Sequence, residues 1–343
     1  MMIIRPIQSS DLDTLTAFSE VAGVGVTTLP KDPQLLAQHI FTSERSFRRS
    51  IPKDRAHYMF ALEDTQQGRV VGMSEIQAAI GLEDVWYNYK VSKSVHASKE
   101  VDAHSTNETL YLNNDLSGVS EVCSLYLDPA YRHSNNGRLL AKSPFLFLKQ
   151  FADYFHEKII AEIQGVSNDD GESPFWESLG KKFFQMEFSD AYHQIAIGNK
   201  SFIAELMPKY PIYLFMLSQE ARLSIGKTHA VTRPAIEVLK KEGFHYNGYI
   251  DIFDAGPVLE AFVENIRAVQ DACSRRCEII QQATPTVTHK SAMLVANRSM
   301  EQFRALLVAK EQVQTETIAL SEEQASALYA EAGTDLWMIP LRY

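Results

Sequence analysis

The chain has 343 residues, of which 45% are apolar and 22% are charged, and its formal net charge at pH 7 is -10. A globular protein of this length can bury a large core and is expected to divide into two domains. The acidic balance argues against general binding to nucleic acids or to anionic membranes, because both need basic patches on the protein surface.

The N-terminal third alternates short strands with helices. Residues 2–6 predict a strand, an amphipathic helix follows it, and residues 30–40 predict a second helix. Residues 57–62 and 70–79 predict two strands joined by a hairpin turn. The first residues lack an apolar region of signal-peptide type, and no run of about 18 apolar residues occurs, so we expect a cytoplasmic protein.

A strand, a polar turn and a helix follow one another in the middle of the chain. Residues 121–127 alternate and are rich in β-forming side chains, and Asp128-Pro129 ends this strand. The turn at residues 132–137 precedes an apolar run with helical spacing. Backbone N–H groups at such a helix start, with Arg132 beside them, can hold a phosphate-like anion. From these residues alone, an ordinary strand-to-helix turn is an equally good interpretation.

The rest of the chain is less regular. Residues 81–100 are aromatic and polar without a clear period, whereas residues 107–114 predict a strand. Further strands are predicted at residues 158–164, 249–253 and 258–263, and helices from residue 173, at 200–208 and 212–225, and from Thr232 to a stop at Gly243.

Short strands dominate after about residue 270, and they predict a small, mostly β domain. The strands fall at residues 292–295, 303–308, 317–320 and 336–341, with a helix at 321–332. Cys273 and Cys277 would share a helix face if their segment is helical. Together with Cys123 they are interpreted as structural thiols, because three cysteines make no disulfide framework and no metal-ligand spacing accompanies them. No metal site is expected.

The order of these elements resembles the acyl-CoA N-acyltransferases of the GNAT type. That family's loop reads Arg/Gln-x-x-Gly-x-Gly/Ala, and here Asn135 replaces the first glycine between Arg132 and Gly137. The resemblance implies an α+β fold, with a mixed, mostly antiparallel sheet flanked by helices at residues 1–265. The small, barrel-like β domain is expected at residues 266–343.

Longer stretches resemble the narrower family of arginine N-succinyltransferases. They include WYNYKVSKSVHASKE, LYLDPAYRHSNNGRLL and SPFWESLGKKFFQMEFSDA. The resemblance implies transfer of succinyl from succinyl-CoA, as a co-substrate rather than a permanent cofactor, to the α-amino group of L-arginine in arginine catabolism. It implies that Leu125 contacts succinyl-CoA and that His229 is the proton donor. The implied carrier-binding residues are Ser124, Leu125, Tyr126, Arg132, Asn135, Asn136 and Gly137.

The chemistry of such a transfer explains why a histidine is needed. An α-amino group is mostly protonated near neutral pH, so it must lose a proton before it attacks a thioester, and the departing thiolate can need one back. A histidine side chain, with an ordinary pKa of about 6.5, can serve either step. Without the family resemblance, His229 would be interpreted as a histidine of a surface loop.

An arginine substrate also needs carboxylates for its guanidinium and donors for its carboxylate. The candidates are Tyr87, Asn88, Tyr89, His96, Lys99, Asn113 and Glu121, each of which can instead be a structural polar residue. Two alternatives stay open at this point: an N-acyltransferase for another amine such as ornithine, and a CoA-binding subunit that acts only with a related partner chain. We expect a homo-oligomer or a pair with a related subunit.

Overall fold

A computed structural model describes residues 1–21, 29–83, 85–168, 172–196, 201–281, 285, 287 and 291–342 of the chain. The strands are β1 (Met2–Pro6), β2 (His57–Asp64), β3 (Arg69–Gln77), β4 (Asn88–Ser98), β5 (Ala103–Asn113), β6 (Ser120–Leu127), β7 (Lys158–Glu162), β8 (Ile212–Tyr213), β9 (His245–Ile250), β10 (Pro257–Phe262), β11 (Cys273–Ile280), β12 (Ala292–Ala296), β13 (Ala305–Ala309), β14 (Thr317–Ser321) and β15 (Asp335–Pro340).

The α-helices are α1 (Leu12–Val21), α2 (Pro33–Phe47), α3 (Asn136–Gln150), α4 (Lys181–Phe184), α5 (Phe188–Ala196), α6 (Ser201–Leu206), α7 (Gln219–Ser224), α8 (Arg233–Glu242), α9 (Arg267–Gln270) and α10 (Glu322–Ala327). Short 3-10 or π turns are η1 (Ser9–Asp11), η2 (Lys53–Arg55), η3 (Pro129–Tyr131), η4 (Ala152–Tyr154), η5 (Trp176–Gly180), η6 (Leu214–Met216), η7 (Ala230–Thr232), η8 (Val263–Asn265) and η9 (Lys310–Gln312).

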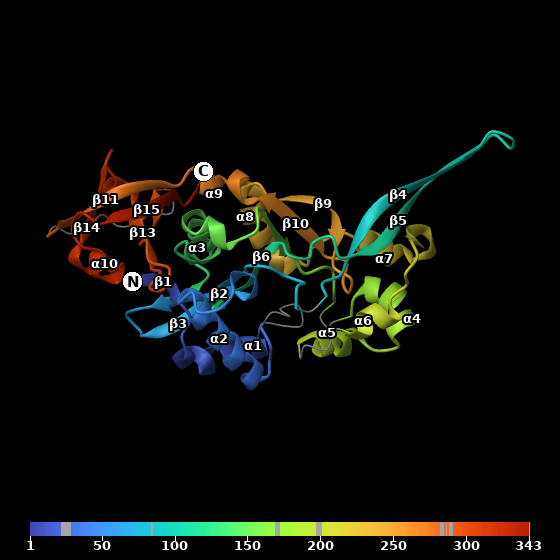
Figure 1. Cartoon of the computed structure of the whole chain (residues 1–343), viewed down its shortest axis with the longest axis horizontal. Coiled ribbons are helices and arrows are strands. Elements are labelled where there is room, and N and C mark those ends of the chain that lie inside the picture. The colour runs from blue at the N-terminus through green and yellow to red at the C-terminus, as the bar shows by residue number, and fades with distance from the viewer. Residues whose placement is uncertain are drawn as a thin grey trace.

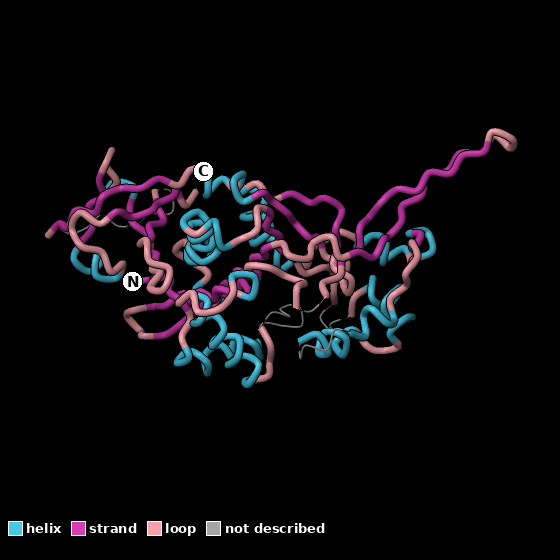
Figure 2. The backbone as a smooth tube through the Cα atoms, viewed as in Figure 1, coloured by secondary structure: helices cyan, strands magenta, loops and turns pink. Residues whose placement is uncertain are grey.

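These strands form one continuous, twisted row across the molecule (Figures 1 and 2). Its order is β14-β11-β15-β12-β13-β1-β2-β3-β6-β7-β10-β9-β4-β5-β8. Among the described residues, β6–β7 and β11–β14 are parallel pairs, whereas neighbours such as β1–β2, β2–β3 and β10–β7 are antiparallel. The expected mixed, mostly antiparallel sheet is therefore confirmed.

Helices cover both faces of the sheet because β2 and β3 are apolar on both faces. Tyr58 and Phe60 of β2 pack in one core cluster with Leu139 of α3. Met59, next along the strand, packs with Ile40 of α2 in a second cluster. Successive strand residues point to opposite faces, so α3 lies on one side of the sheet and α1 with α2 on the other (Figure 1).

A long β4–β5 hairpin projects from the body as an arm (Figures 1 and 2). All eleven residues of β4 pair with β5, from Asn88↔Asn113 to Ser98↔Ala103. Tyr89 and Leu110 are buried at its base, whereas Val95 and Val101 are exposed near its tip. The outer part has no buried face, which explains why residues 81–100 show no apolar period.

The C-terminal strands continue the main sheet. β13 pairs with β1, in the register Ile3↔Leu306, and thereby joins β11, β12, β14 and β15 to the rest. The expected predominance of strands after residue 270 is confirmed, but Cys273 and Cys277 lie on strand β11 and not on a helix. The domain boundary at residues 265 and 266 stays a prediction. Among the described residues, no helix combines the length and apolar character needed to span a bilayer.

Candidate active site

A cavity of about 590 Å³ opens between β6 and β7. Its walls come from α2, from the C-terminal half of β3, from residues 121–125 of β6, from residues 161–164 at the end of β7, and from α8 with residues 251–254. Elements from more than 200 residues of sequence therefore meet around one space.

The cavity exists because two parallel strands diverge. β6 and β7 are paired at Ser120↔Ile159 and Glu121↔Ile160. Beyond these pairs β6 continues to Leu127 along β3, while β7 pairs with β10 on its other side. The separated strands leave backbone groups of β6 able to pair with an extended ligand.

A β-bulge lies where β6 leaves β7. The register of β3 with β6 shifts between Met73↔Tyr126 and Glu75↔Cys123, and Ser124 has a φ of 54°. A left-handed serine is strained, and here its hydroxyl donates to Glu75 Oε2 at 2.8 Å. Leu125, the next residue, is 41% exposed and lines the cavity. The bulge thus turns Leu125 toward the open space.

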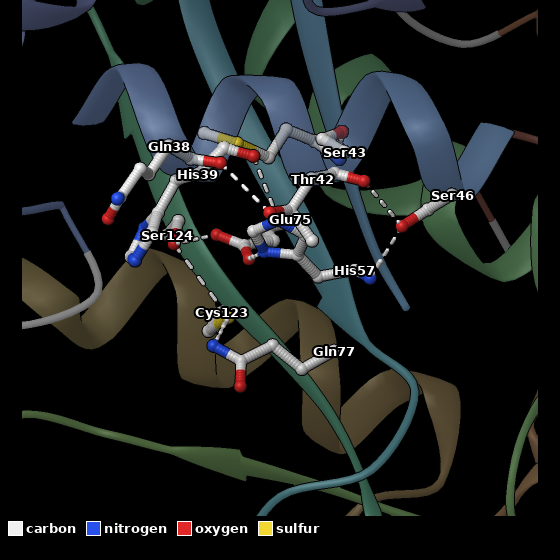
Figure 3. Close-up of polar contacts among 11 residues, drawn as sticks. Gln38, His39, Thr42, Ser43, Ser46, His57, Glu75, Gln77, Cys123 and Ser124 are labelled. Carbon is white, nitrogen blue, oxygen red and sulfur yellow. Dashed lines mark hydrogen bonds and ion pairs between the residues drawn. The ribbon is translucent and has the colours of Figure 1, made fainter. Parts of the chain in front are cut away.

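A buried network of polar side chains fixes this bulge (Figure 3). His57 Nδ1 lies 2.8 Å from Glu75 Oε1, and His57 Nε2 lies 2.9 Å from the backbone oxygen of His39. A backbone oxygen only accepts, so Nε2 donates to His39 while Nδ1 faces the Glu75 carboxyl, and His57 thereby joins β3 to α2. Burial raises the pKa of Glu75, but the hydrogen bond and charge of His57 outweigh this and lower it overall.

The turn before α3 is the second feature of the site. Ser134 and Asn135 are both left-handed, with φ of 52° and 67°, and Asn135 precedes the first turn of α3. Arg342, next to the C-terminal strand β15, donates from Nη2 to Asn135 Oδ1 at 3.1 Å. Burial lowers the pKa of Arg138, and the nearby charge of Arg342 lowers it further. Two guanidinium groups therefore lie close together at a helix N-terminus, which favours an anion.

Four carboxyl groups form one side of the cavity, which we term the acidic wall: Glu121, Glu162, Asp251 and Asp254. The Asp254 carboxylate accepts from the backbone N–H groups of Gly165 and Gly256, at 2.7 and 2.8 Å. A Cβ on Gly256 would lie 2.0 Å from the oxygen of Ile163, so only glycine allows this close approach. Glu162 Oε1 accepts from Asn88 Nδ2 at 2.8 Å.

His229 lies in the loop before η7, beside the cavity. Its backbone N–H donates to the oxygen of Gln164, and Thr232 Oγ1 donates to its backbone oxygen. Gln164 and Thr232 both line the cavity. The His229 side chain is half-buried, and its Nδ1 accepts from the N–H of Val231.

The structure brings only part of the predicted substrate set together. Tyr87 and Glu121 line the cavity, and Asn88 contacts Glu162 behind its wall. Tyr89 is buried in the core, its hydroxyl 3.7 Å from Met207 Sδ.

The remaining three substrate candidates also lie on the β4–β5 hairpin. His96 contacts Tyr213 on the exposed part of the arm, Lys99 lies in its terminal turn, and Asn113 ends β5 with its amide on the oxygen of Tyr111.

The predicted carrier-binding residues lie on two adjoining features. Ser124 and Leu125 line the cavity, whereas Tyr126 points to the α1 side, where its ring lies 4.6 Å from Phe18. Arg132 and Gly137 are exposed in the turn, and Asn135 and Asn136 are buried.

Several polar residues of the site were not predicted. Glu162, Asp254, His57, Glu75 and Arg342 come from segments interpreted as ordinary strands or turns. A glutamate at the end of an apolar strand, KIIAE, was the one local signal available for Glu162.

Known proteins of one family match this chain over almost its whole length. The family model described as arginine N-succinyltransferase beta subunit matches residues 2–268, and that of its C-terminal domain matches residues 275–340. An arginine N-succinyltransferase of Citrobacter koseri is 44% identical over 341 residues, which are 99% of this chain and 98% of that protein. One from Escherichia coli is 45% identical over 341 residues, with the same shares.

A solved structure shares the fold. Subunit AI of arginine/ornithine succinyltransferase from Pseudomonas aeruginosa is 30% identical, with a TM-score of 0.91. The similarity covers 100% of this chain and 99% of that one.

Proposed function

The chain belongs to the arginine N-succinyltransferase family, and from that premise we propose that it transfers succinyl from succinyl-CoA to the α-amino group of L-arginine, giving CoA and N2-succinyl-L-arginine. The observation that carries the proposal is the cavity at the divergence of β6 and β7, which has the acidic wall on one side and, on the other, the strand β6 that leads to the start of α3. A carrier phosphate would lie near the arginines at the start of α3, and a cationic acceptor would lie near the carboxyl groups of the acidic wall.

We propose that the carrier follows β6. Backbone groups at Ser124 to Tyr126 would pair with the pantetheine arm, and the turn at residues 132–138 would hold the pyrophosphate. Arg132 would add charge there, and Asn135 and Gly137 would line the site with their backbone, whereas the N–H of Asn136 closes the turn on the oxygen of His133. Arg342 adds a guanidinium from the C-terminal end. The thioester carbon would then lie at the bulge.

The reaction itself is an attack of the amine on the thioester. The neutral α-amine nitrogen forms a bond to the thioester carbon, the carbon–sulfur bond breaks, and the nitrogen loses one proton while the thiolate gains one. We propose His229 as the group that moves this proton, supported by its anchoring between Gln164 and Thr232. The remaining rate enhancement comes from holding the amine and the thioester next to each other in the right orientation.

Release of free thiol from succinyl-CoA, measured with and without L-arginine, tests the proposal. Thiol is expected only with the amine, and His229→Ala is expected to lower kcat by about 100-fold, because general acid–base catalysis typically contributes that much or more. Thiol release that is absent with both arginine and ornithine would contradict the function. Full turnover by His229→Ala would contradict the role of the histidine alone.

Ornithine is the second candidate acceptor, because the name of the Pseudomonas aeruginosa relative includes it. The description of the family and the name of the Pseudomonas aeruginosa relative both contain the word subunit. We propose that the chain associates with a second copy or a related chain, supported by the exposed Val95 and Val101 on the arm. The activity of the purified chain alone distinguishes these cases: an active chain needs no related partner, whereas an inactive chain does.

A further inference from the structure

We propose that the acidic wall selects the acceptor by holding the delocalised cation at the end of its side chain, with Glu162 as the ionic partner and Asn88 as a second acceptor. This inference rests on the proposed function, because it concerns the same cavity. It identifies a guanidinium, rather than the α-amino group, as the ligand of the wall.

The four carboxyl groups of the wall are not equivalent. Asp251 accepts from the backbone N–H groups of Phe253 and Asp254, at 2.7 and 2.8 Å. Burial raises the pKa of Asp254 well above its ordinary value, and both the charge of Asp251 and a hydrogen bond to that carboxyl raise it further. The two aspartates thus accept backbone N–H groups of the segments beside them and shape the loop at residues 251–256.

Glu162 differs from the two aspartates in its position and in its hydrogen-bond partner. It ends β7, lines the cavity and is half-buried, and the hydrogen bond to its Oε1 comes from a neutral carboxamide. Burial raises the pKa of Glu162 well above its ordinary value, and the charges of Asp251 and Glu121 add to this. A cation bound beside Glu162 would oppose that shift, because it stabilises the carboxylate form.

Asn88 provides a second and independent indication of a ligand. The residue is fully buried, and its Nδ2 donates to Glu162. Its Oδ1 is a buried acceptor without a hydrogen-bond partner among the described residues. Buried acceptors are rarely left unsatisfied, so a donor group is missing from this place.

A guanidinium can supply the missing donor. A planar guanidinium carries five N–H donors in a fixed fork, so one bound at the Glu162 carboxylate would have further donors for the Asn88 oxygen, which belongs to the carboxamide directly behind Glu162. A metal ion does not fit as well, because no three His, Cys, Asp or Glu side chains of the described residues are placed to share one. The same cavity extends to Ser124 and Leu125 at the bulge, so an elongated amino acid can lie between the two.

The test compares L-arginine with L-norleucine as acceptors in the thiol-release assay. Both have the same α-amino and carboxylate groups, but only arginine ends in a cation. Glu162→Gln is expected to lower the ratio of kcat/KM for arginine to that for norleucine by at least about 30-fold, because it removes one partner of a buried charge pair. Asn88→Leu is expected to lower the same ratio about fivefold.

Glu260→Gln is the matched control. Glu260 is a buried glutamate of the neighbouring strand β10, but it pairs with Lys158 at 3.2 Å and does not line the cavity. Its substitution is expected to leave the ratio unchanged, even where it lowers stability.

The outcomes separate the two proposals. Wild-type protein that uses arginine and norleucine equally well would overturn this inference and leave the acyl transfer standing. Glu162→Gln that slows both acceptors equally would also overturn it, because the wall would then serve the shared α-amino group. Absence of thiol release with any amine would instead contradict the proposed function.

Discussion

Glu75 and Glu162 both line the cavity, yet their pKa values move in opposite directions. Both lose hydration, which raises the pKa of each, but Glu75 has a hydrogen bond to His57 at 2.8 Å whereas Glu162 has acidic neighbours. Glu75 is therefore a fixed charge that holds Ser124 in its left-handed conformation. Glu162 is a carboxyl whose charge depends on what binds beside it.

The His57–Glu75 pair leads to a prediction about stability. Glu75→Gln is expected to lower the free energy of unfolding by about 3 kcal/mol, because it removes a buried carboxylate that pairs with His57 and accepts from Ser124. A carboxyl with a lowered pKa stabilises the fold fully above its unfolded pKa, about 4.5, and loses this contribution as the pH falls through the folded value. The difference between variant and wild type should therefore narrow below about pH 4.5.

Urea unfolding at several pH values measures this difference. The control is Glu301→Gln, which breaks an exposed ion pair with Arg48 and should cost at most about 0.5 kcal/mol. Equal losses in the two variants would show that burial of the His57–Glu75 pair does not matter.

Among secondary-structure elements, those with a local signal were predictable. Alternation predicted the strand at residues 121–127, and a proline predicted its end. The structure has β6 at Ser120–Leu127, followed by α3. β4 and β11 were missed, because the arm has no buried face and β11 carries Arg275 and Arg276 within it. The splayed strands and the bulge follow from pairing with β3, β7 and β10, and sequence periodicity does not contain that information.

The same limit applies to the acidic wall. Glu121 was a candidate for the substrate site, whereas Glu162 and Asp254 became neighbours only because β7 pairs with β10. Arg342 was not predicted either, since 207 residues of sequence separate it from Asn135.

The turn before α3 gives a prediction about carrier binding. Arg342→Ala is expected to raise KM for succinyl-CoA about fivefold and to leave KM for arginine unchanged, because one cation next to a phosphate site is worth about 1 kcal/mol. The effect should shrink as salt is added, since exposed charges are screened.

Initial rates at two salt concentrations measure it. Arg298→Ala, which removes an exposed partner of Asp335 in the same C-terminal segment, should leave both KM values unchanged. If the two variants behave alike, the contact between Arg342 and Asn135 has no role in carrier binding.

At the scale of the whole molecule, Lys142 joins three distant parts of the chain. It lies inside α3 and is buried, its Nζ is 2.9 Å from Glu242 Oε1 at the end of α8, and it donates to the oxygen of Pro340 at 3.0 Å. Burial lowers the pKa of Lys142, and the charge of Glu242 opposes this. Helix α3, helix α8 of the cavity wall and the last strand β15 are thereby fixed to one another.

Lys142→Met is expected to lower the free energy of unfolding by about 4 kcal/mol, because it leaves the Glu242 carboxylate buried without its cation. Lys142→Met combined with Glu242→Gln should recover at least about 1 kcal/mol of this loss, since no uncompensated charge remains. Urea unfolding of the single and double variants measures both values. A double variant that is less stable than Lys142→Met would contradict the explanation.

The pairing of β1 with β13 has a consequence for biosynthesis. Ile3 and Leu306 are partners about 300 residues apart, so the ribosome has made most of the chain before β1 can gain its second neighbour. During this interval the nascent chain presents an unpaired strand edge, which is a site for aggregation. Translation slowed or interrupted between residues 265 and 305 should therefore increase the demand for chaperones more than the same delay after residue 309.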